Sequence, residues 1–175
     1  MQEKGEIAIL IGHIPPQDET CIFNWAARFR AIMERYQDVI RIQFYGHVHQ
    51  ERHNIYRSFK NDKAIGVAYW TGSMTPWEEV NPANPSFRRF ILDEATMLPV
   101  AVETYVMDLM SLQPGEVPSF YLDHELTEYY GMADLSPSSF EELSDRFLEI
   151  EDLAAEYLKT KSNHGLNLTY GDDCD

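Results

Sequence analysis

The order of apolar and polar residues predicts a strand, a helix and a second strand in the first 45 residues. Residues 7–11 are an unbroken apolar run, which is typical of a strand buried on both faces. Apolar residues then recur at three- and four-residue steps through 22–36, which predicts an amphipathic helix. Residues 39–45 predict another strand. This order implies two parallel strands joined by a right-handed helical crossover.

The middle of the chain predicts more strands, separated by sequences that favour turns. Residues 54–59, 64–69, 86–92 and 100–109 are the candidates. Asn61-Asp62, Asn81-Pro82, Asn84-Pro85 and Asp93-Glu94 mark the turns between them. The pattern indicates a mixed sheet that is partly antiparallel.

After Gln113-Pro114-Gly115 the pattern becomes helical. We expect one helix over 118–130 with Gly131 as its C-cap, and a second over about 138–161. Ser138 and Glu141 fit a capping box at the start of the second helix. The chain is therefore interpreted as an α/β (α+β) protein with two parts, residues 1–113 and a helical subdomain over 114–175.

Charge is concentrated in the second part. The 175 residues carry 14 Lys and Arg against 29 Asp and Glu, a net charge of −15. Residues 116–175 hold 15 of the acidic residues and only three basic ones. This excess disfavours nucleic acid as a bound scaffold. No apolar run approaches the roughly 20 residues of a membrane span, and the first residues lack the apolar core of a signal peptide.

Histidines follow both of the first two predicted strands. Gly12-His13 follows one, and Gly46-His47-Val48-His49 follows the other. On an extended segment His47 and His49 would point to the same side, and His13 would lie at the end of the neighbouring strand. Three neutral imidazoles there could hold a metal ion such as zinc, either to activate water or as a structural site. The simpler alternative is a set of surface histidines at loop starts.

The sequence around these histidines resembles a known enzyme family. The residues that carry the likeness are Ile9–Pro16, Trp25, Arg35-Tyr36, Gln43–His49, Asn81-Pro82, Asn84–Arg88, Glu103–Tyr105 and Tyr129–Met132. Together they resemble acid sphingomyelinase and the acid sphingomyelinase-like phosphodiesterases, which are calcineurin-like metallophosphoesterases. The resemblance implies the C-terminal half of an αββα sandwich with a mixed sheet, followed by a helical subdomain.

The resemblance also implies a two-metal site, usually zinc. His13 and His47 would ligate one ion and His49 the other. Two such ions clamp a phosphate ester and activate a water that attacks phosphorus. Sphingomyelin would give ceramide and phosphocholine, while relatives prefer nucleotides or other phosphodiesters. An extracellular or lysosomal location is implied, and Asn167-Leu168-Thr169 is a glycosylation sequon.

The sequence departs from the family pattern in three places. Gln17 follows the two prolines, Val48 separates the last two histidines, and Gln50-Glu51 replaces the usual residue-then-Asp. The family's Asp-x-His, Gly-Asp and Gly-Asn-His elements, which supply the bridging aspartate and the catalytic histidines, are not in this sequence. We therefore expect no catalytic residue in this chain, weak metal binding by it alone and little hydrolysis, with a separate N-terminal half as a possible partner.

Three hypotheses remain open at this stage. The chain could be part of a metallophosphodiesterase, a degenerate relative that only binds, or a small zinc protein that uses His13, His47 and His49 alone. In the family this half packs against another sheet, so the isolated chain is expected to expose an apolar face and to dimerise or aggregate.

Other residues carry weaker expectations. His53 is expected to be exposed or to contact substrate, and His124 and His164 to be solvated. Arg88 and Arg89 are expected in surface ion pairs, with phosphate binding as the alternative. Tyr69, Trp70 and Trp77 are expected in the core or along a substrate groove. Cys21 and Cys174 could pair, but the resemblance places the usual partner of Cys21 in the other half and so implies a free thiol.

Overall fold

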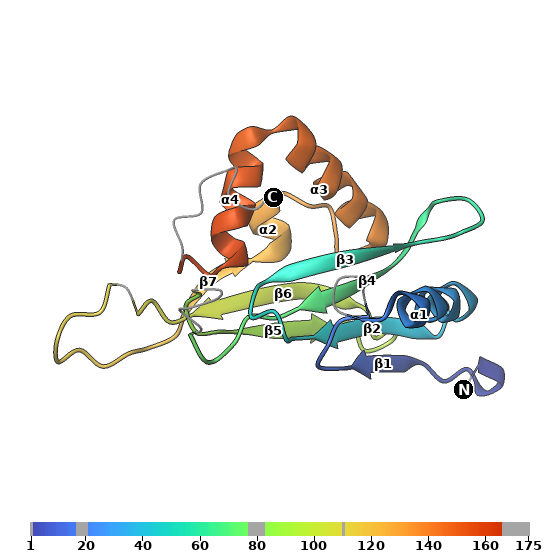
Figure 1. The fold of residues 1–175 in the computed structure, drawn as a ribbon, viewed down its shortest axis with the longest axis horizontal. Coiled ribbons are helices and arrows are strands. Elements are labelled where there is room, and N and C mark those ends of the chain that lie inside the picture. The colour runs from blue at the N-terminus through green and yellow to red at the C-terminus, as the bar shows by residue number, and fades with distance from the viewer. Residues whose placement is uncertain (1, 17–20, 77–82, 110, 166–175) are drawn as a thin grey trace.

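Parallel and antiparallel strands and four α-helices form a mixed α/β fold (Figure 1). The computed structural model describes residues 2–16, 21–76, 83–109 and 111–165. A short 3₁₀ turn, Gln2–Lys4, precedes the first strand. The α+β fold class inferred from the sequence is confirmed.

The first sheet has four strands in the order β1-β2-β4-β3. They are β1 (Ala8–Ile11), β2 (Ile40–Tyr45), β3 (Arg52–Arg57) and β4 (Ala64–Trp70). β1 and β2 are parallel neighbours joined through α1 (Phe23–Arg35), as the sequence predicts. β4 is parallel to β2, and β3 is antiparallel to β4.

The second sheet is antiparallel, in the order β5-β6-β7. Its strands are β5 (Ser86–Leu92), β6 (Pro99–Val106) and β7 (Tyr121–Glu125). The helix expected over 118–130 is wrong in its first part, because Tyr121–Glu125 pairs with β6. Only α2 (Leu126–Tyr130) is helical, and Gly131 ends it in the left-handed conformation with φ 60°, as expected for a C-cap.

The expected helix over 138–161 is two helices, α3 (Pro137–Glu149) and α4 (Glu151–Lys161). Ile150 between them has an extended backbone, with φ −122° and ψ 96°. The N-cap of α3 is Ser136, whose hydroxyl accepts a hydrogen bond from the Ser139 backbone, so the expected capping box is wrong. Glu141 instead pairs with Arg57 and links α3 to β3.

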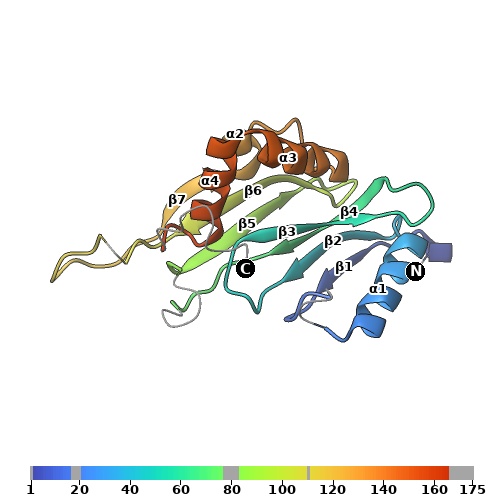
Figure 2. The same cartoon turned by 45° about the horizontal axis from the view of Figure 1, so that its top comes forward.

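Three strands of the first sheet, β2, β3 and β4, contribute side chains to two buried clusters. In the ribbon, α1 lies on the β1–β2 side and α2–α4 lie on the far side of β3 and β4 (Figure 2). Ala68 and Trp70 of β4 face α1 and pack with Met33. Val67 and Tyr69 belong to the opposite cluster, which contains residues of the second sheet and of α2, α3 and α4. The segment 121–161 is therefore packed into the same core as β2 and β4.

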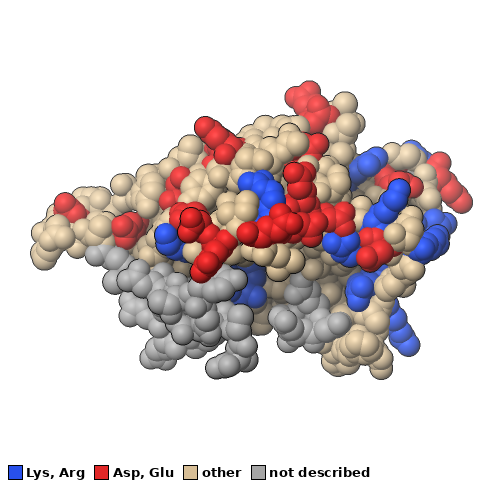
Figure 3. Space-filling view, turned by 90° about the horizontal axis from the view of Figure 1, so that it is seen from above, with Lys and Arg blue, Asp and Glu red and all other residues tan. Residues whose placement is uncertain are grey.

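The charged side chains are unevenly distributed over the surface. Viewed from the side of α2–α4, Asp and Glu are spread over the face, and Lys and Arg gather toward the end that carries α1 and the β3–β4 hairpin (Figure 3). Among the described residues, none of the helices combines the length and apolar character that crossing a membrane requires.

Candidate metal centre

The sheet places His13 and His47 side by side. Ile11 of β1 is in register with Phe44 of β2, so the Gly-His dipeptides that follow the two strands leave the same edge. The ladder continues past the strands: the backbone N–H of Gly12 donates to Phe44 at 3.0 Å, and that of Gly46 donates to His13 at 3.0 Å. The predicted adjacency of the two strand ends is confirmed.

The ring nitrogens of this histidine pair face each other. His47 Nδ1 lies 3.3 Å from His13 Nε2, and the rings meet edge to face with centroids 5.1 Å apart. Zinc bonds to imidazole nitrogen at about 2.0–2.1 Å, so a tetrahedral ion holds two such donors about 3.3 Å apart. Both side chains are exposed, which leaves space for further ligands. The two nitrogens lie within hydrogen-bond range of each other, and their separation matches that of two imidazole ligands on a tetrahedral zinc ion.

His49 is not grouped with this pair. The argument that His47 and His49 share one side of an extended segment is wrong, because both are in the left-handed region, with φ 74° and φ 57°. Among the described residues, no group of three or more His, Cys, Asp or Glu side chains could hold a metal ion. The assignment of His49 as a ligand remains a prediction.

The two glycines before the histidines differ in role. A Cβ at Gly12 would lie 2.7 Å from Cε1 of the Tyr45 ring, so only glycine fits under this side chain. A Cβ at Gly46 would meet nothing closer than 3.9 Å. Close backbone approach therefore requires the first glycine and not the second.

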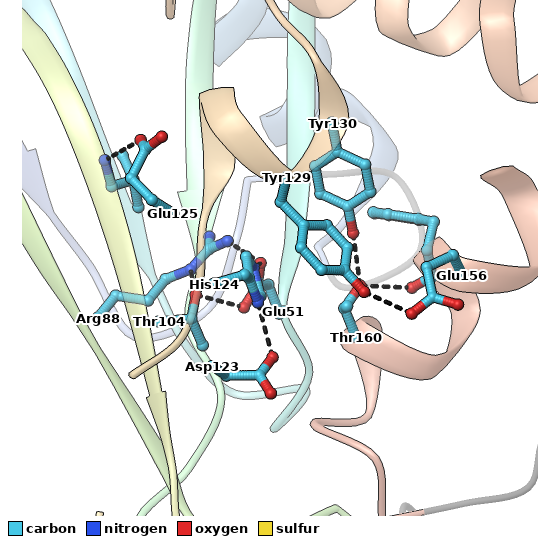
Figure 4. Close-up of polar contacts among 12 residues, drawn as sticks. Glu51, Arg88, Thr104, Asp123, His124, Glu125, Tyr129, Tyr130, Glu156 and Thr160 are labelled. Atoms are coloured by element: carbon cyan, nitrogen blue, oxygen red, sulfur yellow. Dashed lines mark hydrogen bonds and ion pairs between the residues drawn. The ribbon is translucent and has the colours of Figure 1, made fainter. Parts of the chain in front are cut away.

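A buried ionic cluster lies just after the histidine segment (Figure 4). Glu51 pairs with Arg88 of β5 and with His124 of β7, whose Nε2 is 3.0 Å from Glu51 Oε1. The side chains of Arg88 and Glu51 are 3% and 4% exposed, and that of His124 is 0% exposed. The expectation that Arg88 forms a surface ion pair and that His124 is solvated is wrong, because both side chains extend from the second sheet to the buried Glu51. Arg88 also reaches the Trp70 carbonyl of β4.

The cluster extends to Asp123, which accepts hydrogen bonds from two histidines. His124 Nδ1 lies 2.8 Å from it and His164 Nε2 lies 3.1 Å from it. Thr104 Oγ1 donates to the other oxygen of Glu51 at 2.8 Å. His164 is exposed but held by Asp123, so it is paired and not merely solvated. Apart from the neighbours Asp123 and His124, the contacts to Glu51 and the His164–Asp123 contact join residues 37 or more positions apart, so a one-dimensional pattern carries no signal for them.

The charge states in this cluster follow from its contacts. Burial lowers the pKa of His124, but its hydrogen bonds to Asp123 and Glu51 outweigh this and raise that pKa to about 9. Burial raises the pKa of Glu51, but Arg88, His124 and Thr104 outweigh this and hold that pKa below its usual value. Burial likewise opposes the lowering of the Asp123 pKa by His124 and His164. A protonated His124 therefore bridges two carboxylates at neutral pH.

His53 is half-buried and packs against α3 and α4. Its ring centroid is 4.8 Å from that of Phe140 and 5.8 Å from that of Tyr157. Burial, with the charge of Arg88, lowers its pKa to about 4. The expectation that His53 is exposed is wrong because α3 and α4 cover β3.

The structure also locates most of the remaining residues that the sequence singled out. Arg89 forms a surface pair with Glu103 at 2.6 Å, as expected. Tyr69 and Trp70 are buried in the core, which confirms the packing interpretation. Cys21 is a free cysteine. Trp77, Cys174 and the sequon at Asn167 lie outside the described residues.

The fold and the site define a mixed α/β protein with a histidine pair at the carboxyl ends of two parallel strands. Comparison with known proteins identifies the family to which the chain belongs. The chain is 34% identical over 147 residues to sphingomyelin phosphodiesterase B of Dictyostelium discoideum, covering 80% of this chain and 23% of that protein. It is 30% identical to sphingomyelin phosphodiesterase 2 of Caenorhabditis elegans, covering 98% of this chain and 28% of that protein.

A third relative extends the family to a second group of enzymes. The chain is 28% identical to human acid sphingomyelinase-like phosphodiesterase 3b, covering 81% of this chain and 34% of that protein. A scan against models of protein families finds no match. The chain belongs to the family of sphingomyelin phosphodiesterases and acid sphingomyelinase-like phosphodiesterases. It spans about a quarter to a third of the length of these relatives.

Proposed function

We propose that this chain is the metal-binding part of a metal-dependent phosphodiesterase, with zinc held by His13, His47 and His49. The observation that carries the proposal is the 3.3 Å approach of His13 Nε2 to His47 Nδ1 at the carboxyl edge of two parallel strands. In open α/β sheets that edge is where ligand sites form. The family relationship supports phosphodiester hydrolysis as the reaction.

The role of this chain is to bind and orient. Zinc, when bound, would polarise a phosphate ester and lower the pKa of a water molecule. His13 and His47 would present neutral ring nitrogens from two strand ends fixed by backbone hydrogen bonds. The near-neutral charge of residues 1–115, in contrast to the acidic 116–175, makes this region the one suited to an anionic phosphodiester.

The chain by itself should bind zinc weakly and hydrolyse little. A two-metal centre needs a bridging carboxylate to offset the repulsion between the ions, and the described residues bring only two imidazoles together. In this proposal the other ligands and the catalytic histidines come from a separate N-terminal half. The substrate would be sphingomyelin, a nucleotide or another phosphodiester, in a lysosomal or extracellular setting.

Metal analysis of the purified chain tests the assignment. Zinc per chain is measured by mass spectrometry after dialysis, for wild type, His47→Ala and the control His164→Asn, which removes an imidazole elsewhere. We expect up to one zinc per wild-type chain, loss in His47→Ala and retention in the control. Equal zinc content in all three proteins would contradict the proposed ligands.

Activity separates the remaining alternatives. We expect cleavage of bis(p-nitrophenyl) phosphate by the chain alone to stay near background. Robust zinc-dependent cleavage would contradict the claim that hydrolysis requires ligands from outside this chain. A folded chain that binds no zinc at all would favour the binding-module hypothesis instead.

A further inference from the structure

The segment that carries His47 and His49 has a strained backbone. Both residues lie in the left-handed region, with φ 74° and φ 57°. For residues other than glycine this region costs about 1–2 kcal/mol each. Such residues persist only where the surrounding structure fixes them.

The N-terminal end of this segment is held by the first sheet. Gly46 donates its backbone N–H to His13 at 3.0 Å, and Thr71 donates its own to Tyr45 at 3.0 Å. The partners His13 and Thr71 directly follow β1 and β4, the strands that neighbour β2. Within the segment, Val48 donates its backbone N–H to the Gly46 carbonyl at 2.9 Å and closes a turn around His47. These bonds fix the first part of the segment, and the part after His49 is held by other contacts.

The C-terminal end is held at Glu51, two residues after His49. Its backbone N–H donates to Lys161 at the end of α4 at 2.8 Å. Its side chain is held by Arg88 on β5, Thr104 on β6 and His124 on β7 (Figure 4). All three strands of the second sheet therefore converge on one carboxylate.

This anchor is rigid for an electrostatic reason. Arg88 also donates to the Trp70 carbonyl at 3.3 Å and to Thr104 Oγ1 at 3.2 Å, so its position is fixed by β4 and β6. A charge buried without its partner costs several kcal/mol, so Glu51 cannot swing away from Arg88 and His124. The backbone of Glu51 is thereby fixed close to the two histidines.

We propose that Glu51, Arg88, Thr104 and His124 are positioning residues that hold the His47–His49 segment in its metal-binding conformation. The inference rests on the proposed function of His47 and His49. It assigns to the second sheet a role in the metal centre that acts through Glu51. Partners that orient ligands in this way typically influence metal affinity by about 10- to 100-fold.

A matched pair of substitutions tests the anchor. Thr104→Val removes the hydroxyl that donates to Glu51 and accepts from Arg88 Nε, so both members of the ion pair lose one contact, while every charged group of the cluster is kept. Thr160→Val is the control: this hydroxyl is equally buried, at 1% exposure, but bonds to Tyr130 Oη at 2.5 Å and not to Glu51. Thr104→Ser restores the hydroxyl and should restore the wild-type behaviour.

Two readouts are compared in the full chain at a temperature where circular dichroism shows all variants folded. The first is the NMR signals of the residue 47–49 amides and imidazoles without metal. The second is zinc affinity by competition with a chelating dye. We expect Thr104→Val to shift those signals and to weaken zinc binding by about 10-fold, whereas Thr160→Val and Thr104→Ser match wild type.

The outcomes separate this proposal from the one before it. If Thr104→Val leaves signals and affinity equal to those of Thr160→Val, the anchor is overturned even though zinc binds. If wild type binds no zinc, the proposed metal site fails. The metal-free signals then still decide whether the anchor positions the segment.

Discussion

At the scale of single residues, Gly12 matters because the Tyr45 ring occupies the space that a side chain at this position would need. Gly12→Ala would place a Cβ 2.7 Å from the buried Tyr45 ring, whereas Gly46→Ala would meet only contacts at 3.9 Å. We expect Gly12→Ala to lower the free energy of unfolding by about 1–3 kcal/mol through overpacking. The change for Gly46→Ala should stay within about 0.5 kcal/mol. Urea denaturation measures both, and equal losses would contradict the steric argument.

Two histidines predict how stability depends on pH. The pKa of His53 is about 4 in the folded protein, below the unfolded value of about 6.5. The unfolded chain therefore binds more protons between these values, and stability falls as the pH drops from 6.5 to 4. The pKa of His124 is about 9, so the folded protein binds more protons between 6.5 and 9. Stability then falls as the pH rises through that range.

The combined contribution of His53 and His124 to the free energy of unfolding should therefore be largest near pH 6.5. Chemical denaturation from pH 4 to 9 measures this profile. His53→Phe keeps the aromatic packing against Phe140 and should flatten the acid side, while the alkaline side remains as an internal control. The lowered pKa values of Glu51 and Asp123 add a further loss of stability in acid. An unchanged acid side in His53→Phe would contradict the assignment.

At the scale of elements, α3 is held to the sheets by one apolar face. Leu143 is 1% exposed and belongs to the core cluster, whereas Leu148 on the same helix is 89% exposed. We expect Leu143→Ala to lower the free energy of unfolding by about 2–5 kcal/mol, because it leaves a cavity. Leu148→Ala, the same change on the outer face, should stay within about 0.5 kcal/mol. Thermal and urea unfolding of the two variants test this packing. Similar losses of stability in both would contradict the assignment of the buried face of α3.

Local pattern predicted most elements and failed where tertiary contacts decide. The strand over 86–92 and the helix over 22–36 follow from periodicity alone and agree with β5 and α1. Residues 121–125 carry no alternation of apolar residues, yet they form β7 because β6 offers an open edge and Glu51 a partner for His124. The break between α3 and α4 at Ile150 was likewise not predicted, because no glycine or proline marks it in the sequence.

At the scale of the whole molecule, large apolar side chains are exposed on β1, on α1 and on the segment between them. They are Ile9, Ile11, Ile14, Ile22, Phe23, Trp25, Ile32 and Tyr36, with Ile11 83% and Ile22 80% exposed. Within the described sheet, β1 pairs only with β2. An open strand edge beside apolar surface favours association with another chain.

We therefore expect the chain to self-associate in a concentration-dependent way. Sedimentation velocity between about 1 and 100 µM should show a rising weight-average mass. Ile11→Lys with Phe23→Lys should suppress this rise. The matched control is Val117→Lys with Leu148→Lys, which adds the same charge at side chains that are 87% and 89% exposed elsewhere. A monomeric wild type, or equal suppression by the control, would contradict the prediction.

The sequence by itself determined which strands and helices form at the N-terminal end, and that His13 and His47 meet. Periodicity and the parallel strand-helix-strand order are local properties, and parallel neighbours must end at the same edge of a sheet. It also determined the family, through residues near those strand ends.

Only the tertiary structure decided how charged residues are paired and which backbone is strained. Arg88 and His124 are polar residues that a pattern assigns to the surface, yet Glu51 provides the partner that allows both to be buried. The left-handed φ angles of His47 and His49 were likewise visible only in the structure, since neither residue is a glycine. A buried charge needs an oppositely charged or hydrogen-bonding partner close to it in space. That partner can lie anywhere along the chain, so a local sequence pattern does not reveal it.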